Sequence, residues 1–148
     1  MPSFQEMFEK RPGEPIQYKG NTLIVSDRFS LDGHSKFRLT FERCDSQLRQ
    51  GVVLRVYGAG SILMNGEIAK GTICWQDTAP TSCDFEVVDG LDPIVVYNAW
   101  DWGDGVTHSR HHGAAMIVEE LENGRRYRCN DGEPDDDFDD IVFRIERV

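Results

Sequence analysis

The chain has 148 residues, 39% of them hydrophobic, which is enough for one domain with a single buried core. Its formal net charge of −10 comes from 16 basic and 26 acidic residues, and it lacks the basic stripe that sequence-independent binding to nucleic acid requires. No apolar run approaches the ~18–20 residues that span a bilayer, so we expect no insertion into a membrane.

The N-terminal residues show neither the basic nor the apolar region of a signal peptide. Four cysteines, Cys44, Cys74, Cys83 and Cys129, are scattered without a C-x-x-C pair, a spacing that excludes a zinc ribbon. These features predict a cytoplasmic protein with buried free thiols, and they disfavour a disulfide framework.

The start of the chain predicts one short helix. Ser3-Phe4-Gln5-Glu6 fits the capping-box pattern, and Pro12-Gly13 would end the helix. Phe4, Met7 and Phe8 share one helical face, which we expect to pack onto the body of the domain.

From Ile16 onward, the pattern is typical of short strands separated by turns. Asn65-Gly66 and Asn123-Gly124 predict two hairpin turns, because both residues of such a pair tolerate positive φ. A bulge at Gly71 would let the second arm of the first hairpin continue to Trp75. The predicted strands cover residues 22–25, 37–42, 52–57, 61–64, 67–75, 83–88, 94–97, 114–119, 125–129 and 141–147.

Strands at this spacing, without a linker or an internal repeat, predict a single all-β domain over residues 1–148. We expect an antiparallel β-sandwich of jelly-roll type with a short N-terminal helix. In its last strand, Ile141, Phe143 and Ile145 would face the core.

The segment before that strand is strongly acidic. Seven of the ten residues from 131 to 140 are carboxylates, and the rest of the chain has 19 acidic against 16 basic residues. Because a strand follows directly, these charges are held in place and repel one another unless a cation neutralises them. We therefore predict calcium as a cofactor, with Phe138 as a buried anchor; the alternative is a solvated loop that protects a sheet edge. The predicted ligands are Asp131, Asp135, Asp137, Asp139 and Asp140.

Residues 135–142 resemble the D-x-D-F-[ND]-D-x-V loop and strand that end certain calcium-binding β-sandwich domains of bacterial extracellular proteins. The resemblance implies a local calcium site on a β-sandwich. It covers eight residues, so it does not imply a shared function. The EF-hand pattern is not matched, because a strand and not a helix follows the acidic loop.

The segment 97–113 contains two tryptophans, two aspartates and three histidines, and long loops of this kind tend to be functional. Trp100 and Trp102 would offer a platform for a flat ligand such as a sugar, although packing into the core is an equal alternative. Tyr127 and Arg126 are further candidates for ligand binding. Arg126 has the alternative of pairing with glutamates across the second hairpin.

Three functions fit these features. The first is a calcium-binding module that binds a small molecule or carbohydrate through the segment 97–113. The second is a small calcium-dependent enzyme of the lyase, isomerase or cyclase type, whose general acid and base come from Asp101, Asp104, His108 and His111. The third is an acidic interaction or inhibitor subunit that attracts a basic partner. We favour the first; a zinc or iron site at the histidines is a weaker alternative, and the oligomeric state is not encoded in these patterns.

Overall fold

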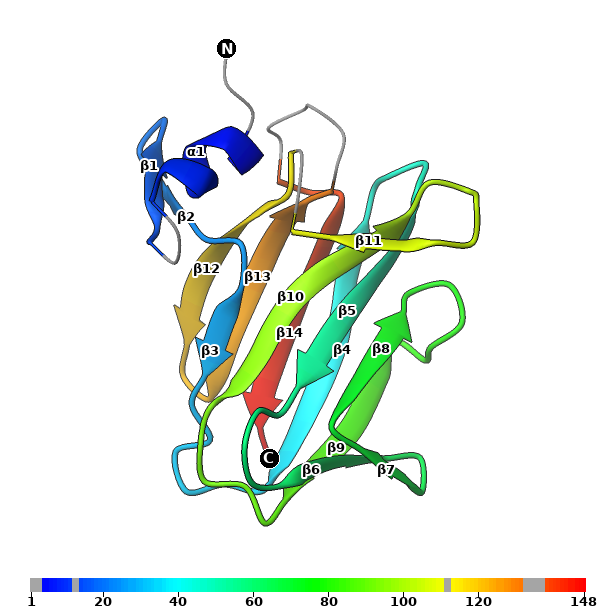
Figure 1. The fold of residues 1–148 in the computed structure, drawn as a ribbon. Helices are drawn as coiled ribbons and strands as arrows, with labels where there is room; N and C mark the ends of the chain where they lie inside the picture. Colours follow the sequence, from blue (N-terminus) through cyan, green and yellow to red (C-terminus); the bar gives the residue numbers. More distant parts are fainter. Residues whose placement is uncertain (1–3, 12–13, 111–112, 132–137) are drawn as a thin grey trace.

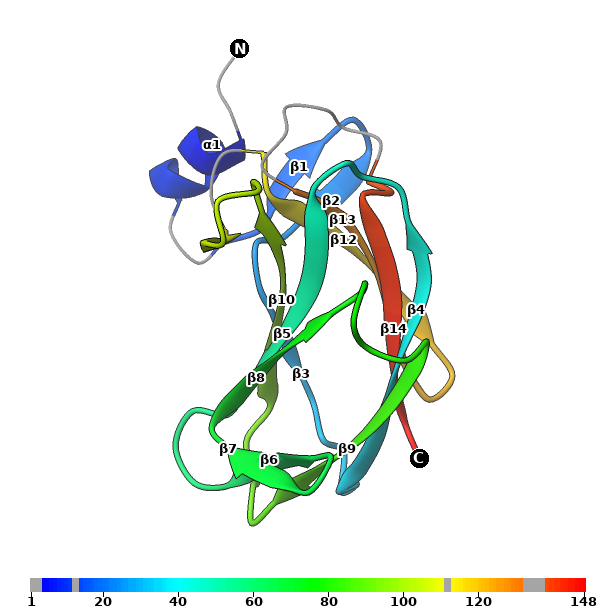
Figure 2. The same ribbon diagram turned by 90° about the vertical axis from the view of Figure 1, so that its right-hand side faces the viewer.

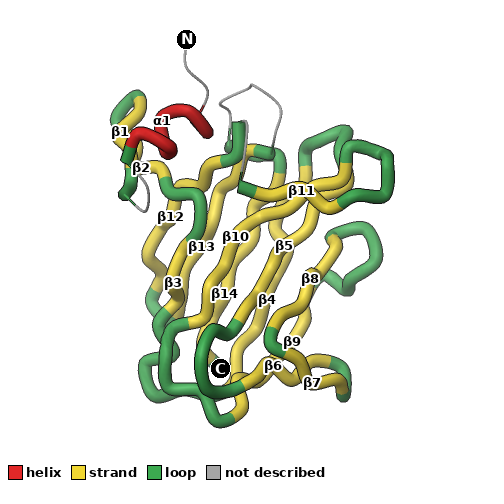
Figure 3. Tube along the Cα trace, viewed as in Figure 1, coloured by secondary structure: helices red, strands yellow, loops and turns green. Residues whose placement is uncertain are grey.

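The computed structural model describes residues 4–11, 14–110, 113–131 and 138–148, and most of its regular structure is β-strand (Figure 3). The helix α1 comprises Phe4–Lys10. The strands are β1 (Ile16–Tyr18), β2 (Asn21–Leu23), β3 (Asp27–Phe29), β4 (Lys36–Cys44), β5 (Arg49–Arg55), β6 (Ser61–Met64), β7 (Glu67–Ala69), β8 (Gly71–Trp75), β9 (Ser82–Val88), β10 (Ile94–Asp101), β11 (Thr107–Ser109), β12 (Ala115–Leu121), β13 (Gly124–Asn130) and β14 (Ile141–Arg147).

Two antiparallel sheets pack face to face. Over the described ranges, one sheet has five strands in the order β11-β10-β5-β8, with β3 also paired to β10. The other has seven, in the order β12-β13-β14-β4-β9-β6-β7. The five-stranded sheet lies in front in Figure 1, and Figure 2 shows both sheets from the side. The predicted all-β antiparallel sandwich with a short N-terminal helix is confirmed.

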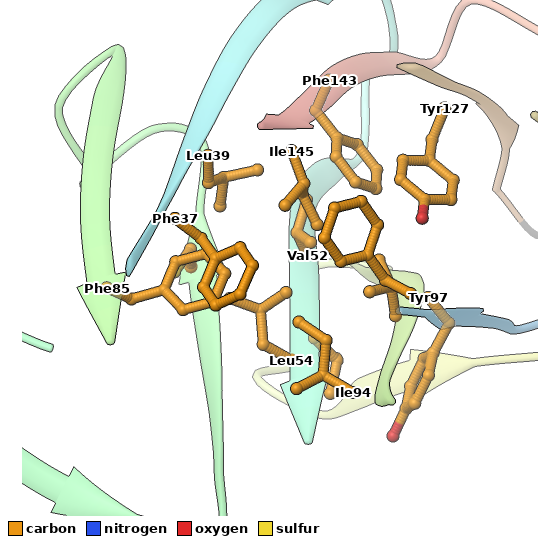
Figure 4. Close-up of a cluster of buried hydrophobic side chains, with 14 of the residues drawn as sticks. Phe37, Leu39, Val52, Leu54, Phe85, Ile94, Tyr97, Tyr127, Phe143 and Ile145 are labelled. Carbon is orange, nitrogen blue, oxygen red and sulfur yellow. The ribbon is translucent and has the colours of Figure 1, made fainter. Parts of the chain in front are cut away.

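The core lies between the sheets and is filled by alternate residues of their strands (Figure 4). On β14, Ile141, Phe143 and Ile145 are fully buried, as their alternation predicted. The Phe143 ring stacks on Tyr127 of β13, with ring centroids 4.9 Å apart. The last strand is therefore a central element of the core.

The Asn65-Gly66 turn joins β6 to β7 as predicted, with φ values of 53° and 78°. The continuation to Trp75 was wrong, because the chain changes sheets after β7. β7 pairs with β6, whereas β8 pairs with β5 of the other sheet. At this crossing, the Lys70 ammonium donates hydrogen bonds to the carbonyl oxygens of Gly58 and Gly60. A pattern of apolar residues does not encode which sheet a strand joins, so the crossing was not predictable.

β10 is longer than expected. It runs through Asn98, Ala99 and Trp100 to Asp101, and these residues pair with the start of β5. β11 then folds back onto the end of β10. Much of the predicted loop is therefore a hairpin whose inward-facing positions are buried.

A second, smaller core cluster lies beside α1. Phe4 of the helix packs with Leu23, Ala115 and Phe138, and its ring meets the Tyr18 ring edge to face at 5.1 Å. Figure 1 shows α1 and the β1–β2 hairpin together at one end of the sandwich. No helix in the described residues is long and apolar enough to cross a membrane.

The four cysteines are free, in agreement with the sequence-based expectation. Cys74, Cys83 and Cys129 are buried, and Cys44 is partly buried. Burial raises the pKa of the Cys74 thiol to about 12.

Substitution of a buried and of an exposed isoleucine tests whether β14 belongs to the core. Ile145 has no exposed surface, whereas Ile68 on β7 is 62% exposed. We expect Ile145→Ala to lower the free energy of unfolding by about 2–5 kcal/mol, through lost burial and the cavity left behind. Ile68→Ala should change it by less than about 0.5 kcal/mol. Urea unfolding of both variants measures the difference; equal losses would contradict the assignment of β14 to the core.

The raised pKa of the Cys74 thiol makes the free energy of unfolding depend on pH. The folded pKa is about 12, above the 9.0 of a free thiol, so the thiol's contribution to stability is complete below pH 9 and is lost as the pH rises toward 12. In that interval the unfolded chain has released a proton that the folded chain retains, which lowers the free energy of unfolding by about 1.4 kcal/mol per pH unit. The free energy of unfolding, measured by urea unfolding at several pH values between 9 and 11, should fall with pH less steeply in Cys74→Ala than in the wild type. The difference should be about 1.4 kcal/mol per pH unit. Identical slopes would refute the burial of this thiol.

Candidate functional site

A buried polar cluster holds the two ends of the acidic segment. Asp131 follows β13 and is fully buried, and its Oδ2 accepts hydrogen bonds from the Ser46 hydroxyl at 2.7 Å and from Gln50 Nε2 at 2.8 Å. Asp140 precedes β14, and its Oδ2 accepts a hydrogen bond from the Asp131 amide at 2.9 Å. Gln50 comes from β5, so the cluster also joins the two sheets.

Asn130 completes this connection. Its side-chain oxygen accepts a hydrogen bond from the Phe138 amide at 2.9 Å, and its carbonyl accepts one from Asn98 of β10 at 2.8 Å. Phe138 is 4% exposed and has a φ of 56°, so the predicted burial of this anchor is confirmed. These hydrogen bonds fix the geometry at the point where the acidic segment leaves the core.

The predicted calcium ligands fall into two groups. Asp135 and Asp137 lie outside the described residues. Asp131 and Asp140 accept the hydrogen bonds given above, and Asp139 Oδ2 lies 3.1 Å from Arg43 Nη2. No group of three metal-ligating side chains occurs within the part of the chain that the structure describes. Calcium binding therefore stays a prediction that depends mainly on residues 132–137.

The four residues predicted to bind a ligand fall into two pairs, Trp100 and Trp102 at the end of β10 and Arg126 and Tyr127 on β13 of the other sheet, so they do not form one site. Trp100 is fully buried, so the alternative of core packing holds for this residue. Trp102 is 37% exposed and meets Trp100 edge to face, with ring centroids 6.0 Å apart. Tyr127 is fully buried, and its hydroxyl donates a 2.6 Å hydrogen bond to Asp27. Arg126 forms ion pairs with Glu42 and Glu119, of which the second is the pairing considered across the hairpin.

Of the predicted acid–base residues, His111 lies outside the described residues, and the others line one turn. Asp101 accepts hydrogen bonds from the amides of Gly103 at 2.7 Å and Gly105 at 3.2 Å. These bonds lower the pKa of Asp101, which makes it a weaker proton acceptor. Asp104 Oδ2 lies 4.0 Å from His108 Nε2, beyond the range of a hydrogen bond. This geometry is typical of a structured turn.

A groove of about 690 Å³ lies on the outer face of the five-stranded sheet, the face seen in Figure 1. We call it the arginine groove. Strands β5 and β10 form its floor, and β8 and the end of β11 flank it. Its described lining contains no Asp, Glu, His, Cys or Lys. The lining residues are Val53, Arg55, Gly71, Thr72, Ile73, Tyr97, Thr107, Ser109 and Arg110.

Two guanidinium groups meet at Tyr97 in this groove. Arg110 lies over the Tyr97 ring, 4.3 Å from its centroid. Interaction with Tyr97 also raises the pKa of Arg55. Gly71 makes room for Arg55, because a Cβ at this glycine would lie 3.1 Å from Arg55 Cγ.

The charges of these two arginines are not balanced locally. Described carboxylates lie within 4.0 Å of Arg38, Arg49 and several other arginines, but none lies that close to Arg55 or Arg110. Arg110 packs over the Tyr97 ring and Arg55 lies beside the Tyr57 ring, and these contacts restrict how far either guanidinium can move before a ligand binds. The groove therefore has the features of a preformed site for a negatively charged group.

Our reading of the sequence missed this site. The signal was Arg55, an arginine within the apolar run Val52 to Tyr57. Arg110 was inside the segment 97–113, which was singled out for its tryptophans and histidines. The proximity of the two arginines depends on the pairing of β5 with β10 and on the fold-back of β11, and neither pairing can be read from local patterns.

Calcium binding has a direct test. If residues 131–140 bind calcium, an excess of calcium should raise the melting temperature and EDTA should lower it, because a ligand that binds only the folded state stabilises that state. Isothermal titration with calcium would measure the affinity, with magnesium as the matched control. A protein that melts identically in calcium and in EDTA has no such site.

Comparison of the chain with models of protein families, with curated proteins and with solved structures gave no match. A functional conclusion about this protein therefore has to come from its own residues.

Proposed function

We propose that this protein is a ligand-binding β-sandwich module and that its arginine groove binds a small molecule carrying a carboxylate, sulfate or phosphate group. The observation that carries this proposal is the convergence of Arg55 and Arg110 on Tyr97, without a described carboxylate beside either guanidinium. The ligand-binding role expected from the segment 97–113 is thereby assigned to its end, at Thr107, Ser109 and Arg110.

The balance of charge supports this choice. The chain as a whole has a net charge of −10, so an anion is repelled from most of the surface. The groove offers two guanidiniums, whose planar N–H groups match the oxygens of a carboxylate or phosphate. Hydroxyl groups of Thr107, Ser109 and Tyr97 also line it and can exchange hydrogen bonds with the polar parts of a ligand.

Binding is better supported than catalysis. General acid–base chemistry uses His, Asp, Glu, Lys, Cys or Tyr. Of these types, the described lining contains only Tyr97, which interacts with Arg55. The groove thus holds groups that attract and orient an anion, with no separate group to carry a proton.

Binding of phosphate, sulfate and galacturonate tests the proposal. We expect at least one of these anions to bind at low ionic strength and to raise the melting temperature. Arg55→Gln and Arg110→Gln should each weaken that binding about tenfold or more, since hydrogen bonds to charged groups contribute about 1.5–3 kcal/mol. Isothermal titration and thermal unfolding are the measurements.

Arg38→Gln is the matched control, because Arg38 is an exposed arginine on the other sheet that pairs with Asp84. It should leave anion binding unchanged. If none of the anions binds, or if the control weakens binding as much as Arg55→Gln does, the groove is not an anion site.

A further inference from the structure

A second groove of about 380 Å³ adjoins the arginine groove on the same side of the molecule. The two grooves share Arg110, so a ligand held by this residue can extend into both. The second groove brings another arginine, Arg28 of β3. Its lining residues are Ser26, Arg28, Tyr57, Asp92, Pro93, Val95 and Arg110.

Strand register places the arginines in a row. Val95 of β10 is the direct partner of Arg28 on one side and of Arg55 on the other. Directly paired residues project from the same face of a sheet, and neighbouring strands lie about 4.8 Å apart, so the Cα atoms of Arg28 and Arg55 are separated by roughly 10 Å. Tyr97, which carries Arg110 over its ring, is two residues from Val95 on the same face.

The surroundings of this row are mixed in character. No described carboxylate lies within 4.0 Å of the Arg28 guanidinium, but Asp92 lines the second groove. Tyr57 is 53% exposed and lies beside Arg55, with the guanidinium 5.5 Å from its ring centroid. The grooves therefore offer separated positive charges, an exposed aromatic ring, hydroxyl groups and one carboxylate acceptor.

We infer that the natural ligand class is a short acidic oligosaccharide, with one negative group held by Arg55 and Arg110 and a second held by Arg28. This inference rests on the proposed anion binding at the arginine groove. Two arginines whose Cα atoms are about 10 Å apart match charges on separate sugar units better than two charges on one small anion. The Tyr57 ring offers a stacking surface for a sugar face.

Asp92 favours binding of an acidic oligosaccharide over binding of an inorganic polyphosphate. A carboxylate in the groove repels a chain whose every unit is charged, whereas it accepts hydrogen bonds from the hydroxyl groups of a sugar. The negative charge of the rest of the chain also disfavours long polyanions that extend beyond the grooves. Both effects favour a short ligand that has neutral hydroxyl groups between its charges.

The test compares galacturonic acid with its di- and trisaccharides in isothermal titrations of the wild type and of Arg28→Gln. We expect an oligomer to bind at least about tenfold more tightly than the monomer, because its second anion engages Arg28. Arg28→Gln should remove most of this gain and affect the monomer much less. Arg55→Gln should weaken monomer and oligomer alike, and the Arg38→Gln control should weaken neither.

Two failures are distinguishable. If the monomer binds in an Arg55-dependent way but the oligomers bind no more tightly, or if Arg28→Gln leaves their advantage intact, the extended site is refuted and the anion groove stands. If neither monomer nor oligomer binds, and phosphate does not bind either, the proposed function itself fails. Tighter binding of tripolyphosphate than of the trisaccharide would overturn the assignment to saccharides. Circular dichroism confirms that each variant is folded.

Discussion

Side-chain alternation on β5 and β10 is the constraint on which both the core and the grooves depend. Val52, Leu54 and Val96 point toward the seven-stranded sheet and are fully buried. Because successive residues of a strand face opposite sides, their neighbours Arg55 and Tyr97 are directed to the outer face. A shift of one residue in the pairing of β5 with β10 would bury Arg55 and dismantle the groove. The hydrophobic core therefore specifies, through the register of the strands, which residues line the proposed binding surface.

Charged groups are in different environments at the ends of the acidic segment and on the outer faces of the sheets. Where the acidic segment enters and leaves, Asp131 and Asp140 are buried and accept hydrogen bonds from Ser46, Gln50 and the backbone. On the outer face of the seven-stranded sheet, Arg126 and Arg144 share Glu42 as a partner. Such pairs set register and contribute little net energy. The arginines of the grooves differ, because no described carboxylate pairs with them. Unbalanced charge at a fixed position is a common property of binding sites.

Periodicity and turn chemistry predicted most of the framework. The strand 141–147 was placed to the residue, and the Asn65-Gly66 hairpin formed as expected. The second hairpin also forms, but neither Asn123 nor Gly124 has a positive φ. A Cβ on Gly124 would clash with the Ile145 carbonyl oxygen, so the glycine permits close approach of β13 to β14. Such a contact between distant segments leaves no local signal.

The site was less predictable than the framework. Composition drew attention to residues 131–140 and 97–113, and each segment contains residues that the structure assigns to packing, such as Trp100 and Asp131. Arg28, Arg55 and Arg110 are unremarkable in sequence and are brought together only by strand pairing. A site formed by pairing of strands that are distant in sequence cannot be predicted from local sequence patterns.

The smaller core cluster has a consequence for how the molecule is assembled. Phe4 and Phe138 come from opposite ends of the chain, yet their rings lie 6.0 Å apart. During synthesis, α1 leaves the ribosome long before Phe138 is made, so the helix can pack on Tyr18 and Leu23 early but meets Phe138 only much later. Once formed, the contact places these two distant segments in one hydrophobic cluster, so we expect that local opening which releases the helix also exposes Phe138.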